Sequence, residues 1–171
     1  MNLQHWIDST MDRSHWGSGP WDAEPDKVSW VDPETGLDCL IVRNRLGALC
    51  GYAGVPPTHP WYEAEYGYGH SIGPKVDEQC EGFCDHNPAY LVDVHGGLTY
   101  SNHCQSSDDP ARGICHVPAR GRPENVWWFG FDCAHSGDRV PLVPPGGDRY
   151  WTVPMVMSEV RSLARQIAKF A

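Results

Sequence analysis

The chain has 171 residues, which is long enough for one domain with a sizeable buried core. Thirteen basic and 22 acidic residues give a net charge of -9, and this balance argues against a protein that binds duplex nucleic acid by neutralising phosphates. The sequence contains no apolar run of about 20 residues that would span a membrane, and its first residues lack the basic start and apolar stretch of a signal peptide, so we expect a cytoplasmic protein.

The composition also bears on the kind of fold. Seven cysteines cannot all pair within the chain, and thiols in a reducing cytosol are more often buried, metal-bound or reactive than paired. Eight tryptophans, 15 prolines and 18 glycines indicate a loop-rich fold with large aromatic anchors.

In chain order, residues 1–26 form a polar arm that contains Trp6, Trp16 and Trp21 and shows no sustained period. We expect this arm to be docked by its tryptophans or to be partly disordered. A single α+β domain is expected over residues 27–171. It begins with apolar runs separated by two Gly-containing turns, which predict a three-stranded antiparallel meander over residues 28–31, 37–43 and 48–55.

Residues 58–88 have no clear period and are expected to form a long loop. A hairpin is predicted around His95-Gly96-Gly97, where the two glycines permit a sharp turn. A short strand is predicted near residues 113–117, and a strong, almost wholly apolar strand over residues 126–132. The Pro- and Gly-rich residues 141–147 form the last connection.

The segment from about Met155 to Phe170 has helical periodicity, because large apolar residues recur on one face. This apolar stripe consists of Val156, Val160, Leu163, Ile167 and Phe170. The predicted fold class is therefore α+β: a mainly antiparallel, twisted sheet of about five to seven strands, loop-rich, with this C-terminal helix packed on one face.

Potential metal ligands and proton carriers follow the strand over residues 126–132. Asp132, His135 and Asp138 lie at and beyond its end, and His95 ends the apolar run of the predicted hairpin. If the two strand ends meet in space, His95 faces this group. Three His or carboxylate ligands with one open position are typical of a catalytic metal, so these four residues are predicted to bind zinc or another divalent metal. His95, Asp132 and His135 are the predicted catalytic residues.

The same cluster also suits a site without metal. His95 or His135 is then the general base, and Asp132 or Asp93 orients its ring through the other nitrogen. Cys133 is disfavoured as a nucleophile, because nothing in the sequence lowers its pKa and its side chain is expected in the core. A further alternative is structural, since histidines and aspartates at strand ends often only cap turns.

A second group of soft ligands lies in the long loop and the segments after it. The sequence Cys80-x-x-x-Cys84-x-His86 is followed by His103-Cys104 and Cys115-His116. An alternative structural zinc is predicted on Cys80, Cys84, Cys104 and Cys115, because bound metal would order a long loop. The simpler alternative is a set of scattered loop and core thiols, since paired Cys-x-x-Cys knuckles are absent.

Aromatic residues gather at the start of the long loop. They form either a stacking surface for a planar ligand or a cover over the core. The group consists of Trp61, Tyr62, Tyr66 and Tyr68, with His59 and His70 beside them.

Three segments carry a resemblance to other proteins: Asp93-Val-His-Gly-Gly-Leu-Thr-Tyr-Ser101, Gly113-Ile-Cys-His-Val-Pro118 and Trp127-Trp-Phe-Gly-Phe-Asp-Cys-Ala-His-Ser-Gly-Asp138. They resemble a group of small proteins of unknown function that bacteriophages and prophages encode. The similarity extends from about Trp21 to the C-terminal helix. It implies a phage accessory protein made in a bacterial host cytoplasm, and it implies no particular activity.

Two classes of function follow. The first is a small hydrolase that acts through the His/Asp cluster on a nucleotide-like or other small substrate. The second is a non-enzymatic acidic protein that binds a host protein through exposed aromatic anchors. Histidines and carboxylates gathered at strand ends favour a pocket, and hence the hydrolase.

Overall fold

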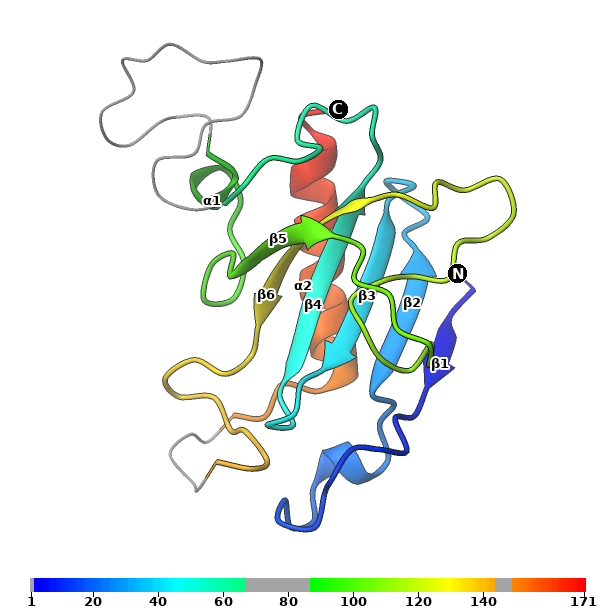
Figure 1. Cartoon of the computed structure of the whole chain (residues 1–171). Helices are drawn as coiled ribbons and strands as arrows, with labels where there is room; N and C mark the ends of the chain where they lie inside the picture. Colours follow the sequence, from blue (N-terminus) through cyan, green and yellow to red (C-terminus); the bar gives the residue numbers. More distant parts are fainter. Residues whose placement is uncertain (1, 67–86, 144–148) are drawn as a thin grey trace.

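The computed structural model of the protein describes residues 2–66, 87–143 and 149–171 (Figure 1). Within these ranges, six antiparallel strands form one sheet in the order β1-β2-β3-β4-β6-β5, and α2 (Val153–Ala168) is the long C-terminal helix. The predicted α+β class is therefore confirmed. The strands are β1 (Gln4–Trp6), β2 (Lys27–Val31), β3 (Asp38–Arg43), β4 (Leu49–Val55), β5 (Tyr100–His103) and β6 (Trp127–Asp132).

The predicted meander is confirmed as β2, β3 and β4. Its two turns contain Gly36 and Gly47, whose φ angles of 73° and 94° lie in the left-handed region that glycine adopts without strain. The next neighbour of β4 in the sheet is β6, the strand predicted over residues 126–132. β6 lies between β4 and β5 and ends at Asp132, and the chain then continues directly into the turn that carries His135 and Asp138.

Helix α2 packs on one face of the sheet, against β3 and β4 (Figure 1). Four of the five residues of the predicted apolar stripe are fully buried there: Val156, Val160, Leu163 and Ile167. The helix begins at Val153, whose main-chain N–H donates a 2.8 Å hydrogen bond to the Glu24 carboxylate. An acidic acceptor at this end suits both the unpaired N–H groups and the helix dipole.

The N-terminal arm contributes the edge strand β1, which pairs with β2 and was not predicted. Trp16 and Trp21 are buried, so the arm is docked through tryptophans. A buried charge network also fastens it, because Asp26 accepts hydrogen bonds from Arg13 at 2.6 Å and Arg43 at 3.0 Å.

Two of the predicted strands are wrong. In place of a strand at the start of the His95 hairpin, residues 88–91 form the short helix α1 (Pro88–Leu91). The Asn87 side chain accepts a hydrogen bond from the Ala89 N–H at 2.9 Å and caps this helix, with Pro88 at its first position, so local capping outweighs the apolar run. The expected strand near residues 113–117 is reduced to a single bridge between Gln105 and Ile114.

The opposite face of the sheet is covered differently. Residues 104–125, here called the cover segment, contain no helix or strand and lie over Leu40, Tyr52 and Trp128. A disulfide between Cys104 and Cys115 closes one loop of the cover segment. Further contacts that fasten it come from Arg122, which binds Asp38 at 2.8 Å, and from Lys27.

Candidate functional site

Two segments that are far apart in the sequence meet beyond the end of β6. The turn over residues 133–138 contacts the turn that carries His95. Nε2 of His95 lies 2.7 Å from Oδ2 of Asp138, and the ring centroids of His95 and His135 are 5.2 Å apart. These three predicted site residues therefore form one cluster.

Asp138 is the centre of this cluster. Its carboxylate accepts hydrogen bonds from the His95 ring at 2.7 Å, from the His135 main-chain N–H at 2.9 Å and from Nε1 of Trp151 at 2.9 Å. Burial alone would raise the pKa of Asp138, but the hydrogen bonds from His95 and His135 outweigh it, and the pKa is lowered. The carboxylate is thus held in its ionised form and in one orientation.

His95 is fixed on three sides. Its main-chain N–H donates to Oε1 of Glu159 on α2 at 2.7 Å, its Nε2 contacts Asp138, and its ring lies 4.2 Å from the Trp151 ring, centroid to centroid. An ionised carboxylate only accepts hydrogen bonds, so Nε2 carries the proton and Nδ1 of the neutral ring keeps its lone pair. Nδ1 makes no hydrogen bond within the described part of the chain, and the side chain is 22% exposed.

His135 lies beside this pair and depends on a glycine. A Cβ atom at Gly96 would overlap the His135 ring, and Gly96 also has a φ of 69°. Only glycine satisfies both conditions without strain. Nε2 of His135 is buried without a hydrogen-bond partner and lies 3.7 Å from Oδ1 of Asp132, which itself caps the N–H of Ala134.

The residues that orient His95 differ from those expected. Asp138 takes the role that was assigned to Asp132 or Asp93. The prediction for Asp93 is wrong, because Asp93 is exposed and its main chain is bound to Gln166 on α2. Trp151 and Glu159 were missed, since neither carries a local motif; only the fold brings the start of α2 to this end of the sheet.

The four predicted metal ligands do not converge as one set. His95 contacts Asp138 and His135 approaches Asp132, which gives two pairs. Among the described residues, the one group that brings three ligand atoms within 4.8 Å of each other is Cys104, Cys115 and His116. In this structure Cys104 and Cys115 are joined as a disulfide.

The remaining described thiols are buried and unreactive. Burial raises the pKa of Cys39, of Cys133 and of Cys50, the last to about 12. Cys133 belongs to the core on the α2 side, as expected, and a nucleophilic role is disfavoured.

Cys80 and Cys84 of the predicted four-cysteine zinc site lie outside the described residues, as does the neighbouring His86. His103 does not join the cysteine group, since its side chain contacts Glu63 at 3.4 Å.

The aromatic group at residues 61–66 is largely part of the core. Trp61 is 2% exposed and its ring stacks on Phe170 at 4.6 Å, so for this residue the alternative of a cover over the core applies and the stacking surface does not. The hydroxyl of Tyr66 donates to the carbonyl of Thr99 at 2.7 Å. Tyr68 and His70 lie outside the described residues.

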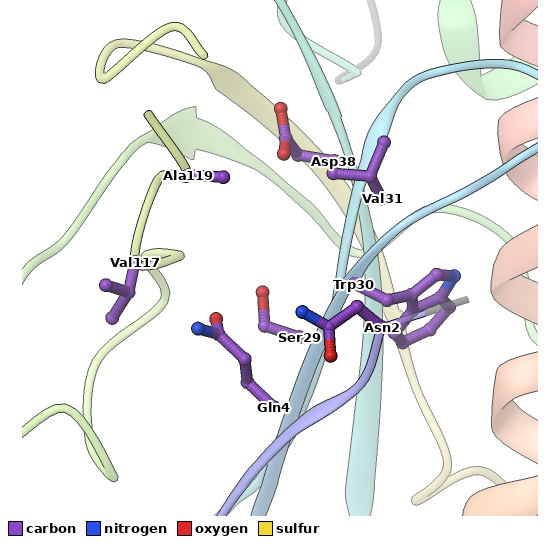
Figure 2. Close-up of a pocket in the computed structure, with 8 residues that line it drawn as sticks. All are labelled: Asn2, Gln4, Ser29, Trp30, Val31, Asp38, Val117 and Ala119. Atoms are coloured by element: carbon purple, nitrogen blue, oxygen red, sulfur yellow. The ribbon is translucent and has the colours of Figure 1, made fainter. Parts of the chain in front are cut away.

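A pocket of about 130 Å³ lies elsewhere, beside β1 and β2 (Figure 2). Ligand sites for small molecules commonly enclose about 300–1,000 Å³, so this pocket is smaller than most of them. It contains none of the cluster residues. Its lining consists of Asn2, Gln4, Ser29, Trp30, Val31, Asp38, Val117 and Ala119.

Comparisons of the chain with protein-family models, curated protein sequences and solved structures found no match. No helix in the described ranges combines the length and the apolar character needed to cross a membrane.

Proposed function

We propose that this protein is a small hydrolase in which His95 is the general base and Asp138 is its orienting carboxylate. The observation that carries the proposal is the contact between Nε2 of His95 and Oδ2 of Asp138, which leaves Nδ1 of a partly exposed ring without a hydrogen bond. A base held by an ionised carboxylate through one nitrogen, with the other nitrogen available, is the arrangement that general base catalysis requires.

The chemistry follows from this arrangement. Nδ1 of His95 accepts a proton from a water molecule, whose oxygen attacks the electrophilic atom of the substrate. The imidazolium that forms is stabilised by the Asp138 carboxylate, and its Nδ1 proton then passes to the leaving group. Trp151 and the His135 main chain keep Asp138 in place, so the base needs little rearrangement during the reaction.

The proposed substrate class is a small hydrolysable molecule, such as a nucleotide. The proposed setting, a bacterial cytoplasm, rests on the resemblance to phage-encoded proteins. The alternative, a non-enzymatic protein anchored on its partner by aromatic residues, has less support because Trp61 is buried. No step of the proposal passes through a metal. A thiophilic metal such as zinc suits Cys104, Cys115 and His116 better than the His/Asp cluster, because Nε2 of His95 already binds Asp138.

The test is a screen of the purified protein on carboxylic esters, phosphomonoesters, phosphodiesters and nucleotides, with and without a chelator. His95→Ala and Asp138→Asn should each lower kcat/KM by roughly 10²–10⁴-fold on any substrate that is cleaved. His5→Ala, a change of an exposed histidine on β1, is the matched control and should leave the rate unchanged.

Thermal unfolding of each variant shows whether the fold is intact. A folded His95→Ala protein with full activity would overturn the assignment, and so would a folded wild type that cleaves none of these classes. Activity that a chelator abolishes and a divalent metal restores would replace the metal-free mechanism with a metal-dependent one.

A further inference from the structure

We propose that Cys104, Cys115 and His116 form a binding site for a thiophilic divalent metal, zinc, once the disulfide between the two cysteines is reduced. This site lies on the cover segment, apart from the His95 cluster, and does not depend on the proposed hydrolase activity. Its ligand atoms lie within 4.8 Å of each other, and the Cα atoms of the cysteines are 4.6 Å apart.

The imidazole of His116 already has the tautomer and the orientation that a metal ligand needs. Its Nε2 lies 3.0 Å from the carbonyl oxygen of Pro123, which can only accept, so Nε2 carries the proton and Nδ1 presents its lone pair. A histidine that ligates zinc through one nitrogen usually donates the other N–H to such a carbonyl. The side chain belongs to a buried residue, so this orientation is fixed.

Nδ1 of His116 points at sulfur. It lies 3.6 Å from Sγ of Cys104. A zinc ion with bonds of about 2.3 Å to sulfur and about 2.05 Å to nitrogen in a tetrahedron holds the two ligand atoms roughly 3.6 Å apart. In the disulfide state neither atom has a proton to share, so a buried lone pair stays unpaired, and a cation would satisfy it.

The surroundings of Cys104 favour a thiolate. Nε1 of Trp128, a fully buried residue of β6, donates a hydrogen bond to Sγ of Cys104 at 3.3 Å. An N–H donor of this kind stabilises negative charge on sulfur, which is the form that binds metal. A cavity of about 200 Å³, lined in part by Cys115, His116 and Arg112, gives an ion access to the group.

The disulfide and the metal exclude each other. A dithiol reductant supplies two electrons and two protons to the Cys104–Cys115 bond and becomes a disulfide itself; the two thiols then release their protons as zinc binds. The sulfur atoms must separate to roughly 3.8 Å to occupy two corners of a zinc tetrahedron. The two segments stay aligned during this change, because the N–H of Gln105 donates to the carbonyl of Ile114 at 3.0 Å.

The test is titration of the reduced, metal-free protein with Co²⁺ and Zn²⁺ under argon. Wild type should bind one Co²⁺ with thiolate-to-cobalt charge-transfer absorption and the intense visible bands of tetrahedral cobalt, and Zn²⁺ should displace it. The oxidised protein should show neither signal. Cys104→Ser and His116→Gln should each weaken binding by about tenfold or more.

Matched controls are His103→Gln, which changes the neighbouring exposed histidine, and Cys50→Ala, which removes a thiol outside the group; both should bind as wild type does. The fold of His116→Gln is checked in its oxidised form, where the disulfide still holds the cover segment. Equal cobalt binding by wild type, Cys104→Ser and His116→Gln would overturn the proposal, and so would a folded, reduced wild type that binds no metal.

Discussion

The two faces of the sheet are covered by different means. On one face the regular helix α2 covers a continuous apolar cluster, in which many side chains make similar packing contacts. On the other, the cover segment has no regular structure. One disulfide and the contact of His116 with Pro123 hold it together internally, and it is attached to the sheet by Arg122, which binds Asp38, and by Lys27. Stability on the first face is therefore distributed, whereas on the second face it is concentrated in single bonds.

The largest loss of stability is expected from a substitution in the buried apolar stripe of α2. Leu163 lies at the centre of the α2 stripe and is fully buried. Leu163→Asp removes its packing and buries a carboxyl group without a partner, so the free energy of unfolding should fall by about 4 kcal/mol or more. Urea denaturation measures this change. Ser158→Asp, on an exposed position of the same helix, is the control; equal midpoints for the two variants would contradict the packing on this face.

The second expected effect concerns the disulfide of the cover segment. The bond closes a loop between residues 11 positions apart, and replacement of Cys104 and Cys115 by alanine should lower the free energy of unfolding by about 3 kcal/mol. Metal-free conditions are required for the comparison. Hydrogen exchange should become faster in the cover segment while α2 keeps its protection, because the two covers contact opposite faces. Uniformly faster exchange in both would show that the faces are not independent.

Substitutions of two strand glycines test how well each face of the sheet tolerates an added side-chain atom. A Cβ at Gly51 would overlap Val160 of α2 and Phe131, whereas a Cβ at Gly130 would overlap the Tyr52 ring on the other face. We expect Gly51→Ala to lower the free energy of unfolding by about 2 kcal/mol, and Gly130→Ala by about 1 kcal/mol, because the irregular cover can yield to a shifted ring. Thermal and urea unfolding of both variants measure the difference. The reverse order would mean that the cover segment is the more rigid of the two.

The same contrast explains what could be predicted from the sequence. The 3.6-residue period of α2 and the apolar runs of β2, β3, β4 and β6 report burial directly, and all five elements were predicted. The cover segment has no period, because its position depends on a disulfide and on side chain to main chain hydrogen bonds. The prediction of a short strand near residues 113–117 was wrong for this reason.

The candidate site also has a part that could be predicted from the sequence and a part that could not. His95, His135 and Asp138 stand out because they follow apolar runs, and the structure brings them together. Their contacts with Trp151 and Glu159 depend on how α2 returns to the end of the sheet, and no local pattern in the sequence encodes that path. The sequence therefore indicated the candidate residues, and the fold decided which of them are partners.

The last expected effect tests the cover segment through a buried charge. Lys27 on β2 is almost fully buried, and its Nζ donates to the carbonyls of Arg112 at 3.1 Å and Gly113 at 3.0 Å. Burial lowers the pKa of Lys27 from 10.5 to about 8. Between these two values the unfolded chain holds a proton that the folded protein has released, so this group makes the protein more stable as the pH rises.

From pH 7 to pH 9 the gain in the free energy of unfolding should be about 1.3 kcal/mol for the wild type relative to Lys27→Met. Taking the difference between the two proteins removes the contribution of cysteines and tyrosines, which act in the opposite direction above their ordinary pKa values. Lys169→Met, at the exposed end of α2, should keep the wild-type pH dependence. A difference between wild type and Lys27→Met that does not change with pH would mean that solvent reaches Nζ, and that the cover segment does not seal this face as tightly as α2 seals the other.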